Sequence, residues 1–358
     1  MESGRQFSSR NNVHINNKEE MPLRWGIVSA AKISHDFVTA FNSFPDRGDA
    51  VIAGVAARDK NRAIDFAKIH DIPHVFDTYE NMANSSEIDV AYIGALNPQH
   101  YDIVCMFLNS GKHVLCEKPL CLNYKQSKSL IKLARSKKLF LMEAVWSRFS
   151  PAYIALEKEI SNGKLGEIKY VDVEFGVPIA HQDRVSKKEL GGSALLDIGI
   201  YTIQFAQYIF KDDPIKITAC GELNNGGVDE VSTIVLEYSG RRRAVLNINA
   251  TLRLSNNANV YGTHGRVTVE DPFHFPTKLT YGDGKVDNYL LHPPKFELNF
   301  ENSTGLVYQA LEVEKCIRKG MLESPRMTHK MSLNLANIED EVRKQIGVHF
   351  DADDKDYP

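Results

Sequence analysis

The sequence predicts an α/β protein of two domains, with a doubly wound parallel sheet followed by a large, mostly antiparallel open sheet. The chain has 358 residues, 43% of them hydrophobic and 25% charged, an ordinary globular composition at a length that suits two domains. Short apolar strands alternate with helices up to residue 145, which indicates parallel strands joined by crossover helices. From residue 146 onward, strand-like runs separated by turn residues dominate, which favours an antiparallel sheet.

The first strand, at residues 23–29, runs directly into a helical pattern. Ser29, Ala31 and Ser34 are small and stand where a dinucleotide-binding turn has its glycines. In such a turn the pyrophosphate lies on the helix N-terminus, so we expect Ser29, Ala31 and Ile33 to contact a cofactor. The glycine pattern is degenerate, however, and an ordinary strand–helix turn fits these residues equally well.

Two arginines follow the second strand, at residues 51–57. Arg58 stands at about the spacing where an acidic residue binds the ribose in NAD sites, and Arg62 lies one helical turn further on. Guanidinium groups suit a 2′-phosphate because they form charge-assisted, bidentate hydrogen bonds with it. The pair therefore favours NADP over NAD, although two solvated arginines at a helix start would give the same pattern.

Polar residues also follow the next long strands. The strand at residues 89–93 ends in a loop that carries Asn97 and His100, and a later strand ends at Glu117 and Lys118. Ligands bind at the carboxyl ends of parallel strands, so we expect all four residues in the cofactor crevice. The other elements expected in this domain are helices at 61–70, 79–84, 101–109 and 124–136 and strands at 73–76 and 139–143.

The second half begins with a helix at residues 151–163. Several of its strand-like runs alternate apolar and polar residues, as a sheet with one covered face does. The expected strands are 168–176, 215–222, 231–238, 243–251, 257–263, 266–270 and 278–281, and two helices, 306–319 and 331–346, close the chain.

The run Gly191–Tyr201, GGSALLDIGIY, is the strongest candidate for chemistry in this half. If it is helical, Asp197 and Tyr201 lie on one face about one turn apart, and the paired glycines allow another backbone or a ligand to come close. A phenol accepts a proton near neutral pH only if its pKa of about 10 is lowered, and Lys118 is the best candidate cation. Alternatively, Asp197 and Tyr201 only satisfy each other in an amphipathic helix.

Composition excludes several classes of function. The net charge of −3 and the absence of a basic arm argue against nucleic acid, and no apolar run reaches the length of a membrane span. The five cysteines show no metal-ligand spacing, so we expect no metal site and a reduced, cytoplasmic setting. The polar ends, residues 1–20 and 351–358, are expected to be flexible tails.

Taken together, these motifs resemble the glucose–fructose oxidoreductase/inositol dehydrogenase (Gfo/Idh/MocA) family. The resemblance rests on GIVSAAKIS near the start, on Glu117-Lys118-Pro119 and on the GG-x-x-L-x-D-x-G-x-Y run, and it covers about residues 21–350. It implies an NADP-binding Rossmann domain at 21–145, a substrate-binding and dimerisation domain at 146–350, and a nicotinamide between them. It also implies that Lys118 and Tyr201 are the catalytic pair, with Asp197 in support.

The closer resemblance is to the subgroup of dihydrodiol dehydrogenases, since tyrosine at position 201 replaces the family's usual histidine. It implies a homodimer that oxidises trans-dihydrodiols to catechols, or D-xylose to its lactone, with hydride transfer to NADP. Other sugar or polyol dehydrogenases, and a non-catalytic NADP sensor, are the alternatives. The aromatic residues expected to line the substrate pocket, which could equally be core, are Trp146, Phe175, Phe275 and Phe300. Phe275 stands where the subgroup has tryptophan, and Ala31 where it has glycine.

Overall fold

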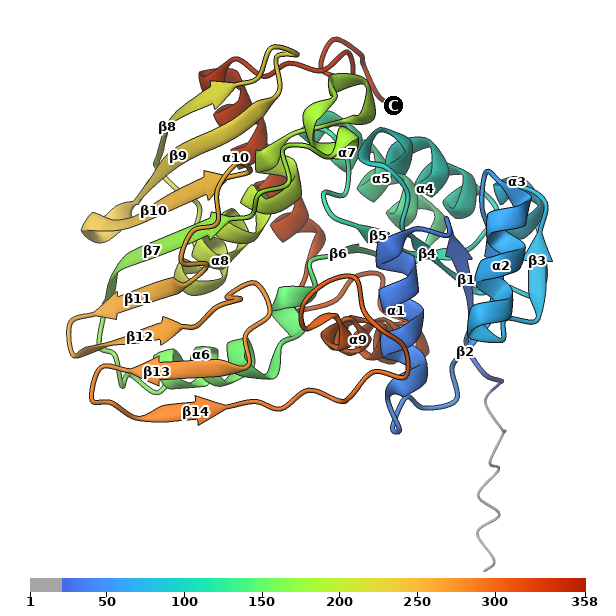
Figure 1. The fold of residues 1–358 in the computed structure, drawn as a ribbon, viewed down its shortest axis with the longest axis horizontal. Helices are drawn as coiled ribbons and strands as arrows, with labels where there is room; N and C mark the ends of the chain where they lie inside the picture. Colours follow the sequence, from blue (N-terminus) through green and yellow to red (C-terminus); the bar gives the residue numbers. More distant parts are fainter. Residues whose placement is uncertain (1–20) are drawn as a thin grey trace, which may run out of the picture.

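The computed structural model describes residues 21–358, and the segment 1–20, expected to be a flexible tail, lies outside the described residues. The molecule contains a six-stranded and an eight-stranded sheet, which lie side by side (Figure 1). The predicted α/β class and the order of the two sheets are confirmed. In Figure 1 the first sheet and its helices are on the right, and the broad second sheet is on the left.

The first sheet is parallel throughout, in the order β3-β2-β1-β4-β5-β6. Helices cover both of its faces, which is why the central strand VAYI is buried along its whole length. The strands are β1 Arg24–Val28, β2 Val51–Ala56, β3 His74–Phe76, β4 Val90–Ile93, β5 His113–Glu117 and β6 Leu141–Ala144. The helices are α1 Lys32–Ser43, α2 Lys60–His70, α3 Tyr79–Ala83, α4 His100–Asn109 and α5 Tyr124–Lys137, with a 3₁₀ turn at Asn97–Gln99.

The second sheet has the order β14-β13-β12-β11-β7-β10-β9-β8 and is antiparallel except where β7 pairs with β10. Its central strands alternate buried and half-buried residues, so one face meets the core and the other is open. The strands are β7 Ile168–Gly176, β8 Lys216–Leu223, β9 Asp229–Tyr238, β10 Arg242–Asn249, β11 Ala258–Gly262, β12 Gly265–Val269, β13 Lys278–Tyr281 and β14 Val286–Asn288.

The inner face of this sheet is covered by helices, of which α8 is buried on every side. Its sequence IYTIQFAQYIF is mostly apolar, as suits a fully buried helix, and its three polar residues Thr202, Gln204 and Gln207 are buried as well. Helices α6, α8 and α10 contact the sheet. The helices of this half of the chain are α6 Pro151–Ser161, α7 Asp183–Ser186, α8 Ile200–Phe210, α9 Leu306–Arg318 and α10 His329–Ile346. A π-helical turn, Leu195–Gly199, precedes α8, and 3₁₀ turns lie at Trp146–Phe149, Lys188–Leu190, Ser239–Arg241 and Ser303–Gly305.

The last two helices return to the first domain. Helix α9 lies beside α1, and α10 contacts both α5 and β8. The edge strand β6 is capped by the same region, because Leu141 donates its backbone N–H to the carbonyl of Leu322, and its own carbonyl lies 3.0 Å from Nε2 of His329. One hydrophobic cluster therefore runs through both domains.

The C-terminal segment 351–358, expected to be flexible, is packed against the first domain. Asp353 accepts hydrogen bonds from Arg343 and from the Asn123 amide, and the Tyr357 hydroxyl accepts one from Gln126. Ala352 is buried beside them. The composition DADDKDYP predicts exposure because it is polar, but a single buried alanine and a paired aspartate are enough to hold the segment in place.

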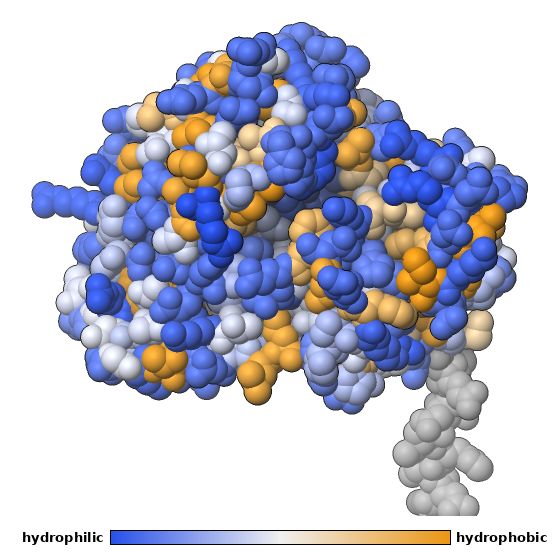
Figure 2. Space-filling model, in the orientation of Figure 1, coloured by the Kyte–Doolittle hydropathy of each residue, from blue (hydrophilic) through white to orange (hydrophobic). Residues whose placement is uncertain are grey.

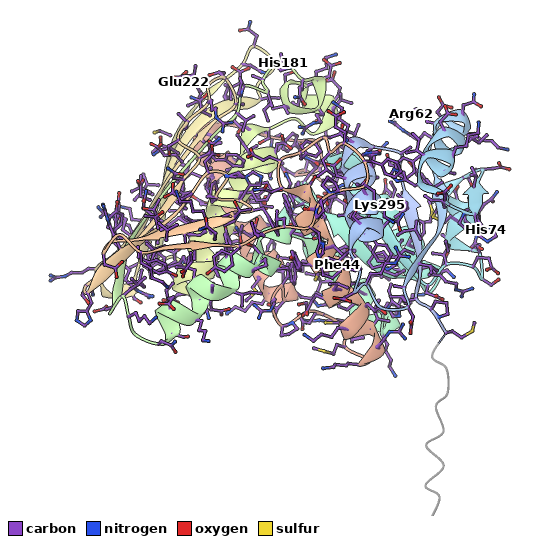
Figure 3. The ribbon with its side chains drawn as sticks, turned by 60° about the horizontal axis from the view of Figure 1, so that its bottom comes forward. Phe44, Arg62, His74, His181, Glu222 and Lys295 are labelled. Carbon is purple, nitrogen blue, oxygen red and sulfur yellow. The ribbon has the colours of Figure 1, made fainter. Side chains whose placement is uncertain are left out.

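A strap of chain, residues 289–302, leaves the second sheet and crosses helix α1. Asp36, fully buried on α1, accepts hydrogen bonds from the backbone N–H groups of Asn299 and Phe300, both at 2.9 Å, and from the Ser303 hydroxyl at 2.6 Å. Figure 3 shows Lys295 and Phe44 close together where the strap crosses, and the Lys295 N–H donates to Ser43. A single carboxylate thus fixes the end of the strap that carries Phe300.

We expect Asp36→Ala to lower the free energy of unfolding by on the order of 3 kcal/mol, because it leaves several buried donors without their charged acceptor. Urea denaturation measures the change, with Asp46→Ala, an exposed aspartate just after the same helix, as the control. A loss no larger than that of the control would mean that the strap is held mainly by other contacts.

Candidate active site

The strand order places a crevice between β1 and β4, where the sheet's connections diverge to opposite sides. Ser29 adopts a left-handed φ of 81° at the turn after β1, and Ala31, the N-cap residue of α1, makes no side-chain capping hydrogen bond. The first N–H groups of α1 are therefore available to an anion. Gly94, at the end of β4, is needed here because a Cβ atom would lie 2.4 Å from the Ser34 hydroxyl. This cradle fits a dinucleotide pyrophosphate, with Ile33 directly beside Gly94.

Three side chains surround the outer end of this crevice. Arg58 is exposed at the end of β2, and Arg62 of α2 donates to the Ala30 carbonyl at 2.9 Å, with its helix at the outside of the molecule (Figure 3). Tyr79, which the sequence reasoning missed, lies against both: burial raises the pKa of its hydroxyl, while Arg58 and a hydrogen bond with Ser29 lower it. These groups fit the phosphorylated ribose end of a dinucleotide. No sequence signal distinguishes Tyr79 from an ordinary first-turn residue.

The loop after β4 contains one expected ligand that is buried instead. His100 is fully buried, and its two ring nitrogens lie 2.8 Å and 3.1 Å from the carbonyls of Pro119 and Ala95. The His100 side chain therefore connects the two loops that border the crevice. The sequence predicts that His100 contacts the cofactor, but in this conformation its ring nitrogens are both occupied by these carbonyls. Asn97 donates to the carbonyl of Gly191 at 3.4 Å, a contact between the two domains.

The two glycines of the Gly191–Tyr201 run admit protein and not a ligand. A Cβ on Gly191 would lie 2.7 Å from the Pro98 ring of the first domain, and one on Gly192 would lie 2.6 Å from the carbonyl of Val185. Gly191 also has a left-handed φ of 71°. Of the two alternatives left open by the sequence, close approach of another backbone holds for Gly192, whereas Gly191 makes room for the Pro98 ring.

Glu117, at the end of β5, faces inward. Its carboxylate accepts a 2.7 Å hydrogen bond from the Tyr92 hydroxyl, and burial raises the pKa of Glu117 to about 7. The Glu117 carboxylate lies beneath the crevice and accepts a hydrogen bond from the backbone N–H of Lys118. Glu117 therefore positions Lys118 and does not itself face the cofactor crevice.

Lys118 and Asp197 meet across the domain boundary. Lys118 Nζ donates to the backbone carbonyl of Asp197 and lies 3.7 Å from its Oδ1, while Arg184 of α7 donates to the same carboxylate oxygen at 2.6 Å. Burial raises the pKa of Asp197, but Lys118 and Arg184 outweigh it and hold that pKa below its usual range. Asp197 is therefore a buried carboxylate between two cations. Arg184 was not predicted, because nothing in the sequence connects a short exposed helix to this site.

Tyr201 does not contact Asp197 through its hydroxyl, so the alternative in which the two satisfy each other is wrong. Its oxygen accepts a 2.8 Å hydrogen bond from the indole N–H of Trp146, and Lys118 Nζ lies 4.7 Å from its ring centroid. Burial and the charge of Glu117 raise the pKa of Tyr201 well above its usual value, and Trp146 and Arg184 lower it. The sequence predicts that Lys118 lowers the pKa of Tyr201. In the structure, however, the Lys118 ammonium lies over the Tyr201 ring and not beside the hydroxyl.

Of the four aromatic residues expected around the substrate, Phe175 and Phe300 remain candidates for the pocket, whereas Trp146 and Phe275 pack behind Tyr201. Phe175 contacts the Tyr201 ring edge-on at 5.8 Å, and Phe300 on the strap is 38% exposed, so both remain candidates for the pocket. Trp146 is 3% exposed and presents its N–H to Tyr201. Phe275 is fully buried and stacks on Trp146 at 4.4 Å, so its prediction as a lining residue is wrong. It is core, and it fixes the indole plane.

In chemical terms the site combines a phenol oxygen, two cations around a carboxylate, and a crevice that fits a dinucleotide. Such a set can move one proton at the phenol while a substrate lies next to the nucleotide. Figure 2 shows the surface recessed between the two halves of the molecule.

Among residues 21–358, no three His, Cys, Asp or Glu side chains lie where they could hold a metal ion together. The helices of the same range include none of the length and apolarity that crossing a membrane requires.

The comparisons with known proteins agree with this geometry. Residues 23–145 match the oxidoreductase family with an NAD-binding Rossmann fold, and residues 153–268 match the GFO/IDH/MocA C-terminal domain. The chain therefore belongs to the Gfo/Idh/MocA family of oxidoreductases, as the sequence motifs predict. It is a dehydrogenase that acts on CH–OH groups and binds a nicotinamide dinucleotide.

Individual relatives are closely similar over nearly the whole chain. The trans-1,2-dihydrobenzene-1,2-diol dehydrogenase of Danio rerio is 43% identical over 334 residues, which are 93% of this chain and 99% of that protein. The enzyme of the same name from Homo sapiens is 42% identical over the same shares. Among solved structures, levoglucosan dehydrogenase in complex with NADH and levoglucosan has a TM-score of 0.80 at 18% identity, covering 91% of this chain and 98% of its own. That identity shows a shared fold only.

Proposed function

We propose that the protein oxidises a secondary hydroxyl group with NADP, and that its substrates are trans-dihydrodiols of aromatic hydrocarbons, D-xylose, or both. The observation that carries the proposal is the Tyr201 oxygen, held by Trp146 beside Lys118 at the end of β5. The dihydrodiol dehydrogenases named above support this substrate class. Hydride acceptance is the chemistry that the bound nicotinamide supplies.

The residues of this chain accept the proton of the substrate hydroxyl. The substrate O–H bond breaks as its proton passes to the Tyr201 oxygen, and the electrons of that bond form the C=O bond of the product. The hydride released from the same carbon would be taken up by the bound nicotinamide. Trp146 keeps donating to the same oxygen throughout, which stabilises the phenolate form that accepts the proton. Lys118 and Arg184 neutralise Asp197, whose charge would otherwise oppose that form.

The choice of NADP rests on Arg58 and Arg62, which flank the outer end of the crevice. We expect Arg58→Asp to raise KM for NADP by about 30-fold or more, because losing a desolvated charge pair typically costs about 2–5 kcal/mol. KM for NAD should change far less. Steady-state kinetics with both cofactors measure the ratio, with Lys60→Asp two residues away as the control. Equal effects on the two cofactors would show that Arg58 does not contact the 2′-phosphate.

A turnover screen tests the function as a whole. Aldoses and cyclic dihydrodiols are incubated with NADP and NAD in parallel, and formation of the reduced cofactor is followed by absorbance. NADPH formation with a dihydrodiol or D-xylose supports the proposal. Turnover only with other polyols would assign a different sugar dehydrogenase, and cofactor binding without any turnover would assign a sensor.

We also propose that the protein is a cytoplasmic homodimer. The open face of the second sheet, where every second residue of the central strands is half-buried, is the surface that a second copy would cover. All five cysteines are free, which suits a reducing compartment. Sedimentation analysis and cell fractionation test the two statements separately.

A further inference from the structure

His274 lies in the wall of the site, on the segment that joins β12 to β13. Its ring stacks on Phe175 at 4.9 Å and lies 5.2 Å from the ring of Tyr201 and 5.8 Å from that of Trp146. Its backbone carbonyl accepts a hydrogen bond from the Ser147 hydroxyl, which fixes the segment. No motif led to this residue, because a lone histidine among aromatic residues looks like core.

The two ring nitrogens of His274 are in different surroundings. Nδ1 is buried and has no hydrogen-bond partner, whereas the residue as a whole is partly exposed. A buried N–H without a partner is rarer than a bare lone pair, so the proton belongs on Nε2, on the exposed side of the ring. Burial and the positive charge of Lys118 lower the pKa of His274 to about 3, so the ring is neutral. The side chain thus offers one N–H donor beside the Tyr201 ring.

We propose that His274 is a specificity-determining residue whose Nε2–H binds the hydroxyl on the carbon next to the one that is oxidised. The inference rests on the proposed function and narrows it, because the substrate class becomes vicinal diols. A trans-dihydrodiol has its second hydroxyl on the adjacent carbon, and so does a pyranose oxidised at C1. One donor next to Tyr201 therefore explains how a single site accepts both kinds of substrate, since each presents the same pair of oxygens.

The test compares substrates that differ only in the second hydroxyl: D-xylose with 2-deoxy-D-xylose, and trans-cyclohexane-1,2-diol with cyclohexanol. A site that donates to a substrate hydroxyl rejects the analogue that lacks it. We expect the wild type to prefer the vicinal diol in kcat/KM by on the order of 10²-fold. In His274→Phe, which keeps the stacked ring, the preference should fall to within about 3-fold, mainly because kcat/KM for the vicinal diol decreases.

Stability separates recognition from a structural role. Nδ1 has no partner, so His274→Phe removes an unsatisfied buried atom and should leave Tm unchanged or raise it. His274→Gln, which restores an N–H donor, should recover part of the preference. His264→Phe, an exposed histidine at the β11–β12 turn, is the matched control and should behave as the wild type.

Three results would overturn the inference. The first is a His274→Phe variant that keeps the wild-type preference for the second hydroxyl. The second is a variant that loses kcat/KM equally on both members of each pair and also loses Tm, which would make His274 a packing residue. The third is a wild type that turns over all four compounds without preference. If the wild type reduces NADP with none of the four and with no trans-dihydrodiol of an aromatic hydrocarbon, the proposed function itself fails, and the inference falls with it.

Discussion

Tyr201→Phe should lower kcat by about 10²- to 10⁴-fold, the usual contribution of a positioned proton acceptor. The substitution keeps the ring, and with it the contacts to Phe175 and to the Lys118 ammonium. Only the oxygen is lost, which removes the proton's destination and leaves the Trp146 N–H without its partner. The dissociation constant for NADP should stay nearly unchanged, because the crevice at β1 and β4 is not touched.

The pH profile gives this prediction a second, independent readout. The phenolate is the accepting form, and burial and the charge of Glu117 raise the pKa of Tyr201 above that of an ordinary phenol. Wild-type oxidation should therefore rise with pH into the strongly alkaline range, along a limb that Tyr201→Phe abolishes. Tyr208→Phe is the matched control: it lies on the same buried helix, and its hydroxyl donates to the carbonyl of Tyr153 and to Glu157. That variant should lose stability and keep turnover. Near-normal turnover of Tyr201→Phe with an unchanged pH limb would show that the phenol only packs, and Asp197 would then be the next candidate for the proton acceptor.

Lys118→Met should lower kcat by a similar factor, about 10²- to 10⁴-fold. Without the ammonium, Asp197 keeps only Arg184 as a cationic neighbour, and its negative charge then acts more strongly on Tyr201. The nearby negative charge raises the pKa of the phenol, so less phenolate is present at any given pH. The pH limb of any residual activity should therefore move to higher pH.

The double variant Tyr201→Phe/Lys118→Met should be little worse than either single one, because residues that act as a unit are not additive. Lys125→Met, an exposed lysine on α5, is the control and should leave turnover unchanged. Multiplicative losses in the double variant would show that Lys118 acts separately from the phenol, for example on the cofactor alone. Thermal unfolding of all variants excludes loss of fold as the cause.

The sequence was sufficient to predict the fold, and it singled out Lys118, Asp197 and Tyr201, which the structure brings together. Alternating strands and helices predicted the parallel sheet, and the small residues Ser29, Ala31 and Ser34 marked the crevice turn. The meeting of Lys118 with Asp197 and Tyr201 was predicted from a family resemblance, since no local pattern connects the end of a strand to a helix in the other domain.

Residues that act through long-range packing were beyond the sequence. His274 and Arg184 carry no motif. Phe275 was expected in the pocket from the family resemblance, but a matching position does not show that the ring is fully buried against Trp146. The π-helical turn at Leu195–Gly199 changes the helical register, so the spacing of Asp197 and Tyr201 did not predict that their polar groups point to different partners.

The return of the chain's end to the first domain has a consequence for biosynthesis. While the protein emerges from the ribosome, the edge of β6 and the part of α1 that α9 contacts are not covered until residues 306–329 are made, because α9 and the Leu322 carbonyl shield them. The nucleotide-binding domain therefore completes its core only after residues 306–329 have been made. A nascent chain stalled before that point displays an unpaired strand edge, the kind of surface that chaperones bind and that seeds aggregation.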